Sequence, residues 1–250
     1  MEKLTSRRNP VCIHLKKLGT GKSYRDEQGL FICEGHKMLD EAVKNGAVVD
    51  VVLSSKKIDT DLPQYTRIYF AENDLINSIS QLKSTPGLLF SCRKNLLSCG
   101  DYHSGTHLLL DDIQDPGNAG TILRSASAFG IKTVIFTEGS ADVYNPKSVR
   151  ASMGAIFRQP SCVLTYDEIY ELKKSGIKFI GASNESGASD IRNVSFKDSV
   201  IIIGNEGRGL SGELRAICNE MVSIPLSPGN DSLNAAVAAS ILMWEAMSRV

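Results

Sequence analysis

Residues 111–130, DDIQDPGNAGTILRSASAFG, are the stretch that decides the fold of this chain. They follow the apolar run LLL, pass through an Asp-Pro-Gly-Asn turn and enter a segment of small residues with one arginine, Arg124. An apolar strand that leads through a glycine-containing turn into a helix is typical of a parallel α/β unit. Because sites in such sheets lie at the carboxyl ends of strands, this turn is a candidate site loop.

The same alternation extends over the whole region from residue 106 to residue 250. Apolar strands are predicted at HLLLDDI (107–113), TVIFTE (133–138), KFIGAS (178–183), SVIIIG (199–204) and MVSIP (221–225), and a helix at SLNAAVAASILMWEAM (232–247). Near-continuous apolar strands that alternate with helical stretches indicate a parallel sheet covered on both faces. The predicted fold class of this region is therefore α/β.

Residues 1–95 have a different texture and predict a second, smaller α/β domain. GLFICEGHKMLDEAVKNG (29–46) indicates a strand and then a helix, and AVVDVVLSS (47–55), TRIYFA (66–71) and LLFSCRK (88–94) indicate further strands. A polar connector with Ser and Gly follows. We place the domain boundaries at 1–95, 96–105 for the linker, and 106–250.

Composition narrows the class of protein. No apolar run approaches the roughly 20 residues of a membrane helix, and the N-terminal residues lack the apolar core of a signal peptide. The six cysteines are scattered without any C-x-x-C pair, so we expect reduced thiols and no metal site. We therefore expect a cytoplasmic protein with no membrane partner.

Formal net charge is zero, but residues 1–30 carry seven Lys or Arg against three Asp or Glu. Such a cluster with an aromatic residue could bind an RNA phosphate backbone, although a solvated basic face would look the same. The candidate RNA-binding residues are Arg7, Lys16, Lys17, Lys22, Tyr24 and Arg25.

The loop at residues 114–120 and the predicted helix that follows it each offer one candidate side chain. Asn118 immediately precedes the predicted helix, so it is a candidate N-cap as well as a functional amide. Arg124 lies on the helical wheel with Ser127 and Ala128, away from Ile122 and Leu123. It is either a solvated cation or a fixed guanidinium that meets a phosphate or a developing anion.

Two further loops follow strands and are rich in glycine or proline. GNEGRGL (204–210) fits neither the G-x-G-x-x-G fingerprint nor a Walker A loop, and Glu206 between glycines is either functional or paired with Arg208 or Arg215. In LSPGNDSLN (226–234), Asp231 or Ser232 is the candidate N-cap, which would place Asn234 inside the last helix.

These three loops, in this order, resemble the three signature motifs of the SpoU/TrmH family of RNA ribose 2'-O-methyltransferases, within the SPOUT superfamily. The segments that carry the resemblance are DDIQDPGNAGTILRSASAFG, IIIGNEGRGLS and IPLSPGNDSLNAAVA. SRRNPVCIHLKKL and KSYRDEQGLFICEG in the first region resemble the family's small ribosomal-protein-like (L30e-like) RNA-binding domain. The resemblance therefore covers nearly the whole chain.

The resemblance implies a parallel sheet with a deep trefoil knot, a homodimer through the knotted domain, and S-adenosyl-L-methionine bound in the knot without a metal. The implied catalytic and RNA-phosphate positions are Asn118, Arg124, Glu206, Ser232 and Asn234. The implied cofactor-binding positions are Ala182, Gly204, Ile224, Leu226 and Leu233. One departure from the family pattern is Pro228, which replaces the usual glycine and bears on the backbone path near Leu226.

The implied activity is 2'-O-methylation of a ribose in RNA, with 23S ribosomal RNA favoured by the N-terminal domain. The same chemistry on tRNA is an alternative within the family. A catalytically inactive RNA-binding protein is an alternative from another class, against which the intact Asn118, Arg124, Glu206 and Asn234 argue. A Rossmann-type methyltransferase or dehydrogenase would need a glycine-rich turn after its first strand that DDIQDPGNAG does not supply.

Overall fold

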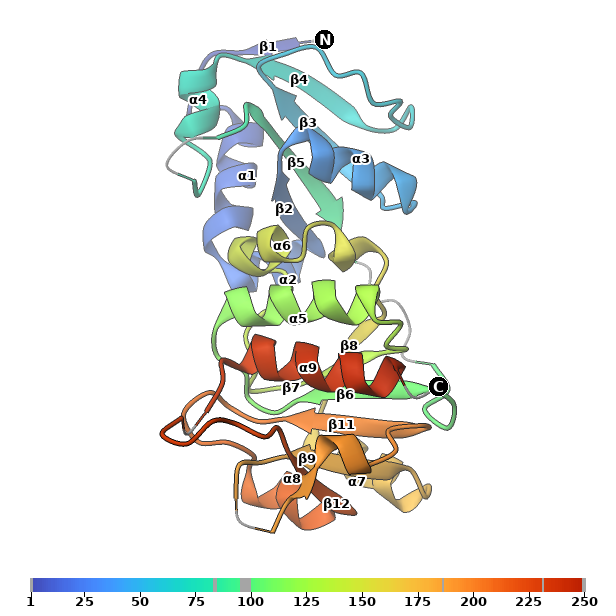
Figure 1. The fold of residues 1–250 in the computed structure, drawn as a ribbon. Helices are drawn as coiled ribbons and strands as arrows, with labels where there is room; N and C mark the ends of the chain where they lie inside the picture. The colour runs from blue at the N-terminus through green and yellow to red at the C-terminus, as the bar shows by residue number, and fades with distance from the viewer. Residues whose placement is uncertain (1, 83–84, 95–99, 186, 231, 249–250) are drawn as a thin grey trace. The chain divides into compact units, whose positions relative to one another are not determined.

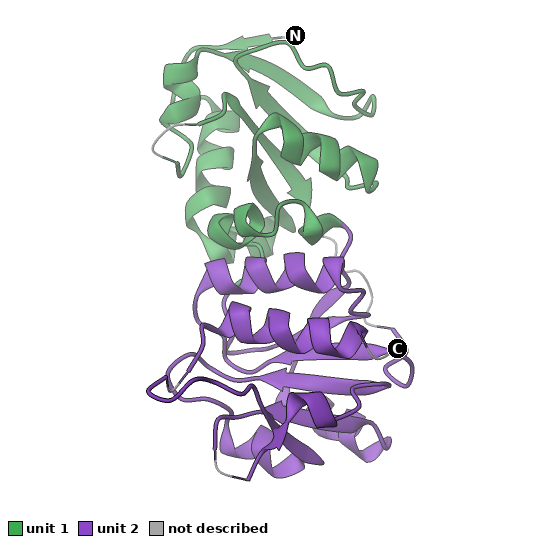
Figure 2. Cartoon of the chain, viewed as in Figure 1, with its two compact units in different colours: residues 1–95, 142–157 green, residues 96–141, 158–250 purple. Residues whose placement is uncertain are grey.

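The chain folds into two compact units, which Figure 2 colours separately in the computed structural model. The structure describes residues 2–82, 85–94, 100–185, 187–230 and 232–248. Unit 1 comprises residues 1–95 and 142–157, and unit 2 comprises residues 96–141 and 158–250. Each unit is built around its own sheet, and the labels in Figure 1 are used for the elements below.

Unit 1 contains a mixed five-stranded sheet in the order β1-β4-β3-β5-β2. Its strands are β1 (Glu2–Leu4), β2 (Leu30–Glu34), β3 (Val49–Ser54), β4 (Arg67–Ala71) and β5 (Leu88–Arg93). β4 runs parallel to β1 and β3, whereas β5 runs antiparallel to β3 and β2. The predicted strands of residues 1–95 are confirmed, and β1 is an additional edge strand that the sequence pattern missed.

The helices of unit 1 are α1 (Pro10–Thr20), α2 (Lys22–Gln28), α3 (His36–Lys44), α4 (Asn73–Asn77) and α6 (Pro146–Ala151), with a 3₁₀ turn η1 (Ala155–Phe157). α1 begins at Pro10 because the Asn9 side chain accepts a hydrogen bond from the Val11 N–H, while proline fits the first helical position. Its buried face, Cys12, Leu15 and Leu18, packs into the core formed with the strands.

Residues 142–157 pack with unit 1, although the sequence assigned them to the domain of residues 106–250. The Phe31 ring of β2 lies 4.8 Å from the Tyr144 ring and 6.1 Å from the Phe157 ring, between centroids. The buried Arg25 guanidinium donates to Asp142 at 2.6 Å and to the Leu18 carbonyl at 2.8 Å. A segment distant in sequence therefore completes the core of unit 1.

The Arg25–Asp142 pair yields a stability prediction. Asp142→Asn should lower the free energy of unfolding by about 2 kcal/mol, because a buried guanidinium loses its charged acceptor. Glu72→Gln is the matched control, since Glu72 pairs with Lys3 at an exposed position and its loss should cost less than about 1 kcal/mol. Urea denaturation of both variants measures the difference. Equal stabilities would show that the buried pair does not hold the segment.

Unit 2 contains a seven-stranded sheet in the order β10-β12-β9-β11-β6-β7-β8, and every neighbouring pair is parallel. The strands are β6 (Thr106–Leu110), β7 (Val134–Thr137), β8 (Ser161–Leu164), β9 (Lys178–Ala182), β10 (Ser189–Asp190), β11 (Ser199–Ile203) and β12 (Glu220–Ser223). The predicted parallel α/β sheet is confirmed. β8 and β10 were missed because both are short edge strands with partly polar sequences.

The helices of unit 2 are α5 (Pro116–Ala128), α7 (Tyr166–Lys174), α8 (Gly212–Ile217) and α9 (Ala235–Met247), with a 3₁₀ turn η2 (Ile191–Asn193). α5 and α9 lie side by side (Figure 1), and Ser240 donates to Ser125 at 2.9 Å between them. Phe179, Val200 and Ile202 of the central strands lie in a core that includes Ile169 of α7 and Leu214 of α8. Helices α7 and α8 therefore share a core with the apolar central strands of the sheet.

The structure shows the state of five of the six cysteines. Cys12, Cys33, Cys92 and Cys218 are free, but Cys162 is disulfide-bonded, so the prediction of six reduced thiols is wrong at this position. Cys99 and residues 96–98 of the expected linker lie outside the described residues. Within the described ranges, no helix has the length and apolar character needed to cross a membrane.

Candidate active site

The order of strands in unit 2 brings two of the three loops together. β6 continues through β7 to β8 on one side, while β11 lies on its other side, so the direction of winding reverses between β6 and β11. Loops diverge at such a point in a parallel sheet and leave room for a ligand at the carboxyl ends. The loops after β6 and after β11 are the first and second sequence motifs.

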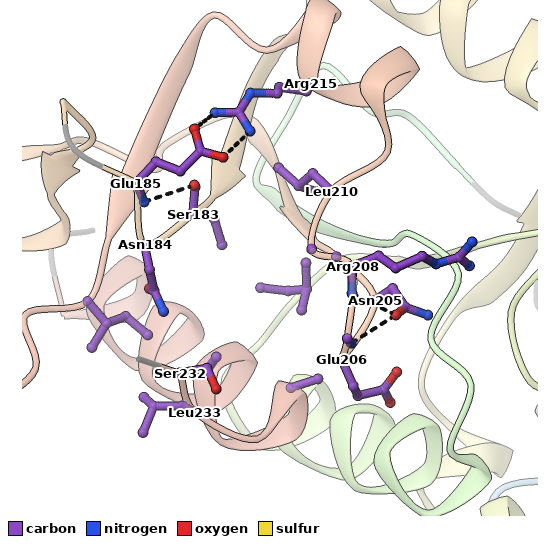
Figure 3. Close-up of a pocket in the computed structure, with 18 of the residues that line it drawn as sticks. Ser183, Asn184, Glu185, Asn205, Glu206, Arg208, Leu210, Arg215, Ser232 and Leu233 are labelled. Atoms are coloured by element: carbon purple, nitrogen blue, oxygen red, sulfur yellow. Dashed lines mark hydrogen bonds and ion pairs between the residues drawn. The ribbon is translucent and has the colours of Figure 1, made fainter. Parts of the chain in front are cut away.

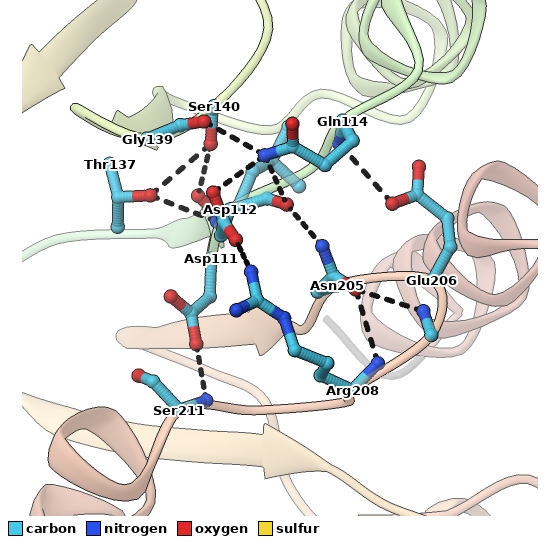
Figure 4. A network of polar contacts seen from close by, with 12 residues as sticks. Asp111, Asp112, Gln114, Thr137, Gly139, Ser140, Asn205, Glu206, Arg208 and Ser211 are labelled. Atoms are coloured by element: carbon cyan, nitrogen blue, oxygen red, sulfur yellow. Dashed lines mark hydrogen bonds and ion pairs between the residues drawn. The ribbon is translucent and has the colours of Figure 1, made fainter.

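A polar network holds these two loops against each other (Figure 4). The Asn205 side chain donates to the Asp112 carbonyl at 2.8 Å and accepts from the backbone of Gly207 and Arg208. The Arg208 guanidinium pairs with the Asp112 carboxylate. The buried Asp111 carboxylate accepts from the Ser211 N–H at 2.6 Å. Both ends of the second loop are therefore tied to the loop after β6.

The start of α5 differs from the expected N-cap. Asp115 is the N-cap, and its carboxylate accepts from the N–H groups of Gly117 and Asn118 at 2.5 and 3.2 Å, with Pro116 in the first helical position. Asn118 is therefore already inside the helix. Because it has no capping role, its side-chain amide is available to contact the other loops.

Asn118, Glu206 and Asn234 form a chain of hydrogen bonds that joins all three motifs. The Asn118 amide donates to the Glu206 carboxylate at 2.8 Å, and its carbonyl oxygen accepts from the Asn234 amide at 3.0 Å. Asn234, not Ser232, is the N-cap of α9, since its side chain accepts from the N–H groups of Ala236 and Val237. The other expected cap, Asp231, lies outside the described residues.

Glu206 is a hydrogen-bond acceptor for the loop after β6, and neither Arg208 nor Arg215 is its partner. Its carboxylate accepts from the backbone N–H groups of Gln114 and Asp115 at 3.2 and 3.4 Å as well as from Asn118. Arg208 pairs with Asp112, and Arg215 pairs with Glu185. Burial acts to raise the pKa of Glu206, but these hydrogen bonds outweigh it and lower the pKa below the ordinary value.

This pKa shift predicts a pH dependence. Because the folded-state pKa of Glu206 is lowered, its stabilising contribution is present above its ordinary value of 4.5 and is lost as pH falls through the folded-state pKa. Glu206→Gln should lower the free energy of unfolding at pH 7 by about 1 kcal/mol, at the low end because Glu206 is exposed. It should also flatten the fall in stability below pH 4.5. Parallel pH-dependent melts of both proteins test this, and identical curves would contradict it.

A cavity of about 450 Å³ lies among the loops after β9, β11 and β12 (Figure 3). Four of the five expected cofactor-binding residues line it: Ala182, Gly204, Ile224 and Leu233. Glu206 and Ser232 line it as well. The lining combines apolar and polar side chains in similar proportion, and the volume lies in the range of a small-molecule site.

Leu226 is absent from the described residues that line this cavity. Beside it, Ser227, Pro228, Gly229 and Asn230 form a tight turn in which the Asn230 N–H donates to the Ser227 carbonyl at 3.3 Å. Gly229 has a φ of 87° and follows proline, as in a type II turn. Pro228 therefore has a local explanation as the residue that pre-sets this turn.

The loop after β9 lines the cavity, as the family resemblance implied for the segment GASNESG (181–187) near Ala182. Ser183, Asn184 and Glu185 line it after β9, and the Glu185 carboxylate forms a two-bond ion pair with Arg215, also part of the lining (Figure 3). No individual role was predicted for Ser183, Asn184 or Glu185, and Arg215 was not expected in the lining. A carboxylate in a loop that follows an apolar strand was the available signal.

Arg124 does not join this group within the described part of its own chain. It is exposed on α5, while Ile122, Leu123 and Ala126 of the same helix are buried, as the helical wheel predicted. It has no hydrogen bond or ion pair with any described residue, and it is not among those that line the cavity. Its guanidinium is free to meet a ligand from outside the chain.

The candidate RNA-binding residues of unit 1 fall into two groups. Arg7, Lys16, Lys17 and Lys22 are exposed. Tyr24 is half-buried, with its hydroxyl 2.8 Å from His14 Nδ1 and the Lys17 ammonium over its ring. Arg25 is buried and bound to Asp142, which corrects its assignment as an RNA contact. A buried guanidinium paired with a carboxylate has no face for a phosphate.

Two protein-family models match the chain. Residues 105–244 match the model of the SpoU rRNA Methylase family, and residues 2–89 match the MRM3-like substrate binding domain. Together the two models span most of the chain, in the order that the sequence motifs predicted.

Individual relatives agree with these models. A 23S rRNA (guanosine(2553)-2'-O)-methyltransferase of Bacillus subtilis, RlmP, is 30% identical over 98% of both chains. A 23S rRNA (uridine(2479)-2'-O)-methyltransferase of Streptomyces viridochromogenes is 38% identical over 56% of this chain and 51% of its own. The crystal structure of the SpoU methyltransferase AviRb from the same organism, in complex with AdoMet, has a TM-score of 0.86 and 27% identity, covering 97% of this chain and 98% of AviRb.

Proposed function

Because this chain belongs to the SpoU rRNA Methylase family, we propose that it transfers the methyl group of S-adenosylmethionine to a ribose 2'-hydroxyl of 23S ribosomal RNA. The single observation that carries this proposal is the hydrogen-bonded series Glu206–Asn118–Asn234. It joins three motifs from distant parts of the sequence beside a cavity suited to the cofactor.

The residues of the cavity fit S-adenosylmethionine. Ile203, Leu210, Ile224 and Leu233 offer apolar walls for an adenine ring, and the polar loop after β9 can bind hydroxyl and charged groups. Gly204 brings the backbone of the second motif to the cavity without a side chain. When bound, the cofactor supplies a methyl group on a sulfonium, which is already strongly electrophilic.

The chain's own residues then have to position the ribose hydroxyl and help its proton leave. Alignment of reacting groups contributes on the order of 7 kcal/mol at the low end of measured effective molarities. We assign Arg124 to the phosphate beside the target ribose, where its fixed positive charge also stabilises the developing alkoxide. Arginine holds its proton in proteins, so an electrostatic role is preferred to that of a general base.

Asn118, Glu206, Ser232 and Asn234 hold the ribose and the geometry of the loops. Glu206 keeps its carboxylate ionised because three donors point at it, and it fixes the Asn118 amide in one orientation. Asn118 in turn accepts a hydrogen bond from the Asn234 amide, which links the start of α9 to the start of α5. Ser232 adds a hydroxyl at the cavity wall.

We also propose a deep trefoil knot in unit 2 and a homodimer formed through this unit. Val237, Trp244 and Met247 of α9 are exposed apolar side chains, and Trp244 packs edge-on against Phe129 after α5. A groove beside them is lined by Asn118, Thr121 and Asn234. Exposed apolar surface of this kind supports an interface with a second copy. In such a dimer, Arg124 would reach the partner's cavity.

We propose that unit 1 recruits the ribosomal RNA and that the protein works in the cytoplasm. The MRM3-like substrate binding domain match and the exposed cations of unit 1 support RNA binding by this unit. A relative named as a 23S rRNA 2'-O-methyltransferase matches over 98% of the chain, which favours ribosomal RNA over tRNA.

The test is to locate 2'-O-methylated nucleotides in RNA from cells with and without the gene, followed by tritium transfer from labelled S-adenosylmethionine to the identified RNA in vitro. We expect one or a few 23S rRNA positions to lose methylation. Methylation lost only from tRNA would overturn the substrate, and cofactor binding without product on any RNA would overturn the activity.

A further inference from the structure

A second cavity, of about 270 Å³, lies in unit 1 between α1 and the end of α4. Cys12 and Ile79, both buried, form an apolar floor together with Ile13. Arg7, Lys16 and Lys17 line the same cavity, and Thr20 adds a hydroxyl. The cavity therefore combines an apolar floor with a rim of hydrogen-bond donors.

The helix α1 explains how these residues come together. Ile13, Lys16, Lys17 and Thr20 are spaced i, i+3, i+4 and i+7, so they project from one face of the helix. Ile13 is 41% exposed and leaves apolar surface open beside Lys16 and Lys17. An apolar group entering from outside would cover it.

Among the described residues, the charged side chains that line the cavity are all cations. Neither Arg7, Lys16 nor Lys17 forms an ion pair with a described residue, and no Asp or Glu lines the cavity within that part of the chain. By contrast, Lys3 and Arg67 of the same unit are paired with Glu72 and Asp50. Three cations around one cavity, none of them in an ion pair with a described residue, favour an anionic ligand.

We propose that this cavity binds one unpaired nucleotide of the RNA substrate, with the base on the apolar floor and its edge at Arg7, and with the phosphate on Lys16 and Lys17. This inference rests on the proposed function for the identity of the RNA. Proteins read RNA chiefly at unstacked bases, which they hold against apolar or planar side chains. A helical duplex presents only its backbone to such a site, so the apolar floor would stay uncovered.

The chemistry of the rim also matches one kind of base edge. The guanidinium and the two ammonium groups only donate hydrogen bonds, so they pair with acceptor atoms. Guanine carries two adjacent acceptors, O6 and N7, on one edge, which an arginine can bind together. An RNA hairpin with one unpaired guanosine is therefore the appropriate probe.

The experiment compares the binding of the full chain to two fluorescent hairpins by anisotropy at fixed salt. One hairpin carries a single unpaired guanosine in its stem, and the other is fully paired. We expect the first to bind at least about fivefold more tightly, as holding one base contributes this much or more. Arg7→Ala and Ile13→Glu should reduce this ratio to below about twofold.

Two matched variants separate a base pocket from a basic surface. Lys22→Ala removes an exposed cation of α2 outside the cavity and should weaken both hairpins equally. Val48→Glu places the same charge as Ile13→Glu at another exposed apolar position of unit 1 and should keep the ratio. Equal binding of both hairpins by the unaltered chain, or an equal loss for both in Arg7→Ala, would overturn the inference.

The outcome is independent of catalysis. S-adenosylmethionine binding is measured on the same variants, because its cavity lies in unit 2 and should not change. If methyl transfer occurs while the hairpins bind alike, the nucleotide site fails and the proposed function stands. If no RNA is methylated but the preference for the unpaired guanosine is observed, the proposed activity fails and the nucleotide site stands.

Discussion

We expect replacement of Arg124 by alanine to lower the rate of methyl transfer by about a thousandfold, while binding of S-adenosylmethionine should stay within about twofold. The rate falls because the charge that steadies the phosphate and the developing alkoxide is lost. Cofactor binding is retained because Arg124 is exposed on α5 and does not line the cofactor cavity of its own chain. Tritium transfer measures the first effect and calorimetry measures the second.

Arg124→Lys is the informative companion. Lysine keeps the charge but loses the planar group that binds a phosphate through two parallel hydrogen bonds, so we expect only partial activity. Arg158→Ala is a further control, since Arg158 is an exposed arginine of the same unit that donates to Ser127 of α5. A full rate in Arg124→Ala would remove this residue from the mechanism.

Gly204→Ala should weaken S-adenosylmethionine binding by more than about a hundredfold. A Cβ at this position would overlap the backbone of Gly209 and Leu210, which close the loop after β11 through paired hydrogen bonds between Asn205 and Gly209. Backbone cannot move aside as a flexible side chain can, so the loop has to open. Calorimetry checks the loss of affinity.

Gly207→Ala is the matched control in the same loop. Its φ is not positive, and an added Cβ would meet only Asn205 Oδ1 at 3.7 Å, an ordinary contact. We expect affinity within about threefold of the original protein. If both alanine variants bind the cofactor equally well, the close approach of the backbone at Gly204 has no part in forming the cavity.

Mixing the Arg124→Ala and Gly204→Ala variants tests whether Arg124 acts on the cavity of the partner subunit. In a heterodimer of Arg124→Ala and Gly204→Ala, one of the two sites would combine an intact cavity with an intact arginine. After subunit exchange, half of the dimers are mixed and each has one working site, so about a quarter of the original activity should return. No recovery, with exchange confirmed by mass spectrometry, would place Arg124 and the cavity in the same chain.

The sequence predicted the parallel sheet because its strands are buried on both faces and therefore read as uninterrupted apolar runs. The sequence pattern missed the short edge strand β8, because SCVL is only four residues long and partly polar. The N-terminal caps of two helices, α5 and α9, were also predicted wrongly. Asn118 was expected to cap its helix but lies inside α5, and Asn234 was expected inside the last helix but caps α9, because the capping position depends on one pair of backbone angles.

The candidate site was predictable as a set of residues and not as an arrangement. The motifs indicated Asn118, Glu206 and Asn234, but their shared hydrogen bonds depend on strand order, which one sequence does not reveal. Arg25 was misassigned for a related reason. Its carboxylate partner lies 117 positions further along the chain, and composition near the N-terminus looks the same whether a cation is buried or solvated.

The interleaved division of the chain has a consequence for how this protein can be taken apart. Residues 142–157 belong to the same compact unit as residues 1–95, so the backbone passes between the units three times. Cutting at residue 95 would release a fragment without its Tyr144 and Phe157 rings and with the Arg25 charge stranded. Transplanting unit 1 onto another protein would accordingly require two grafts, not one.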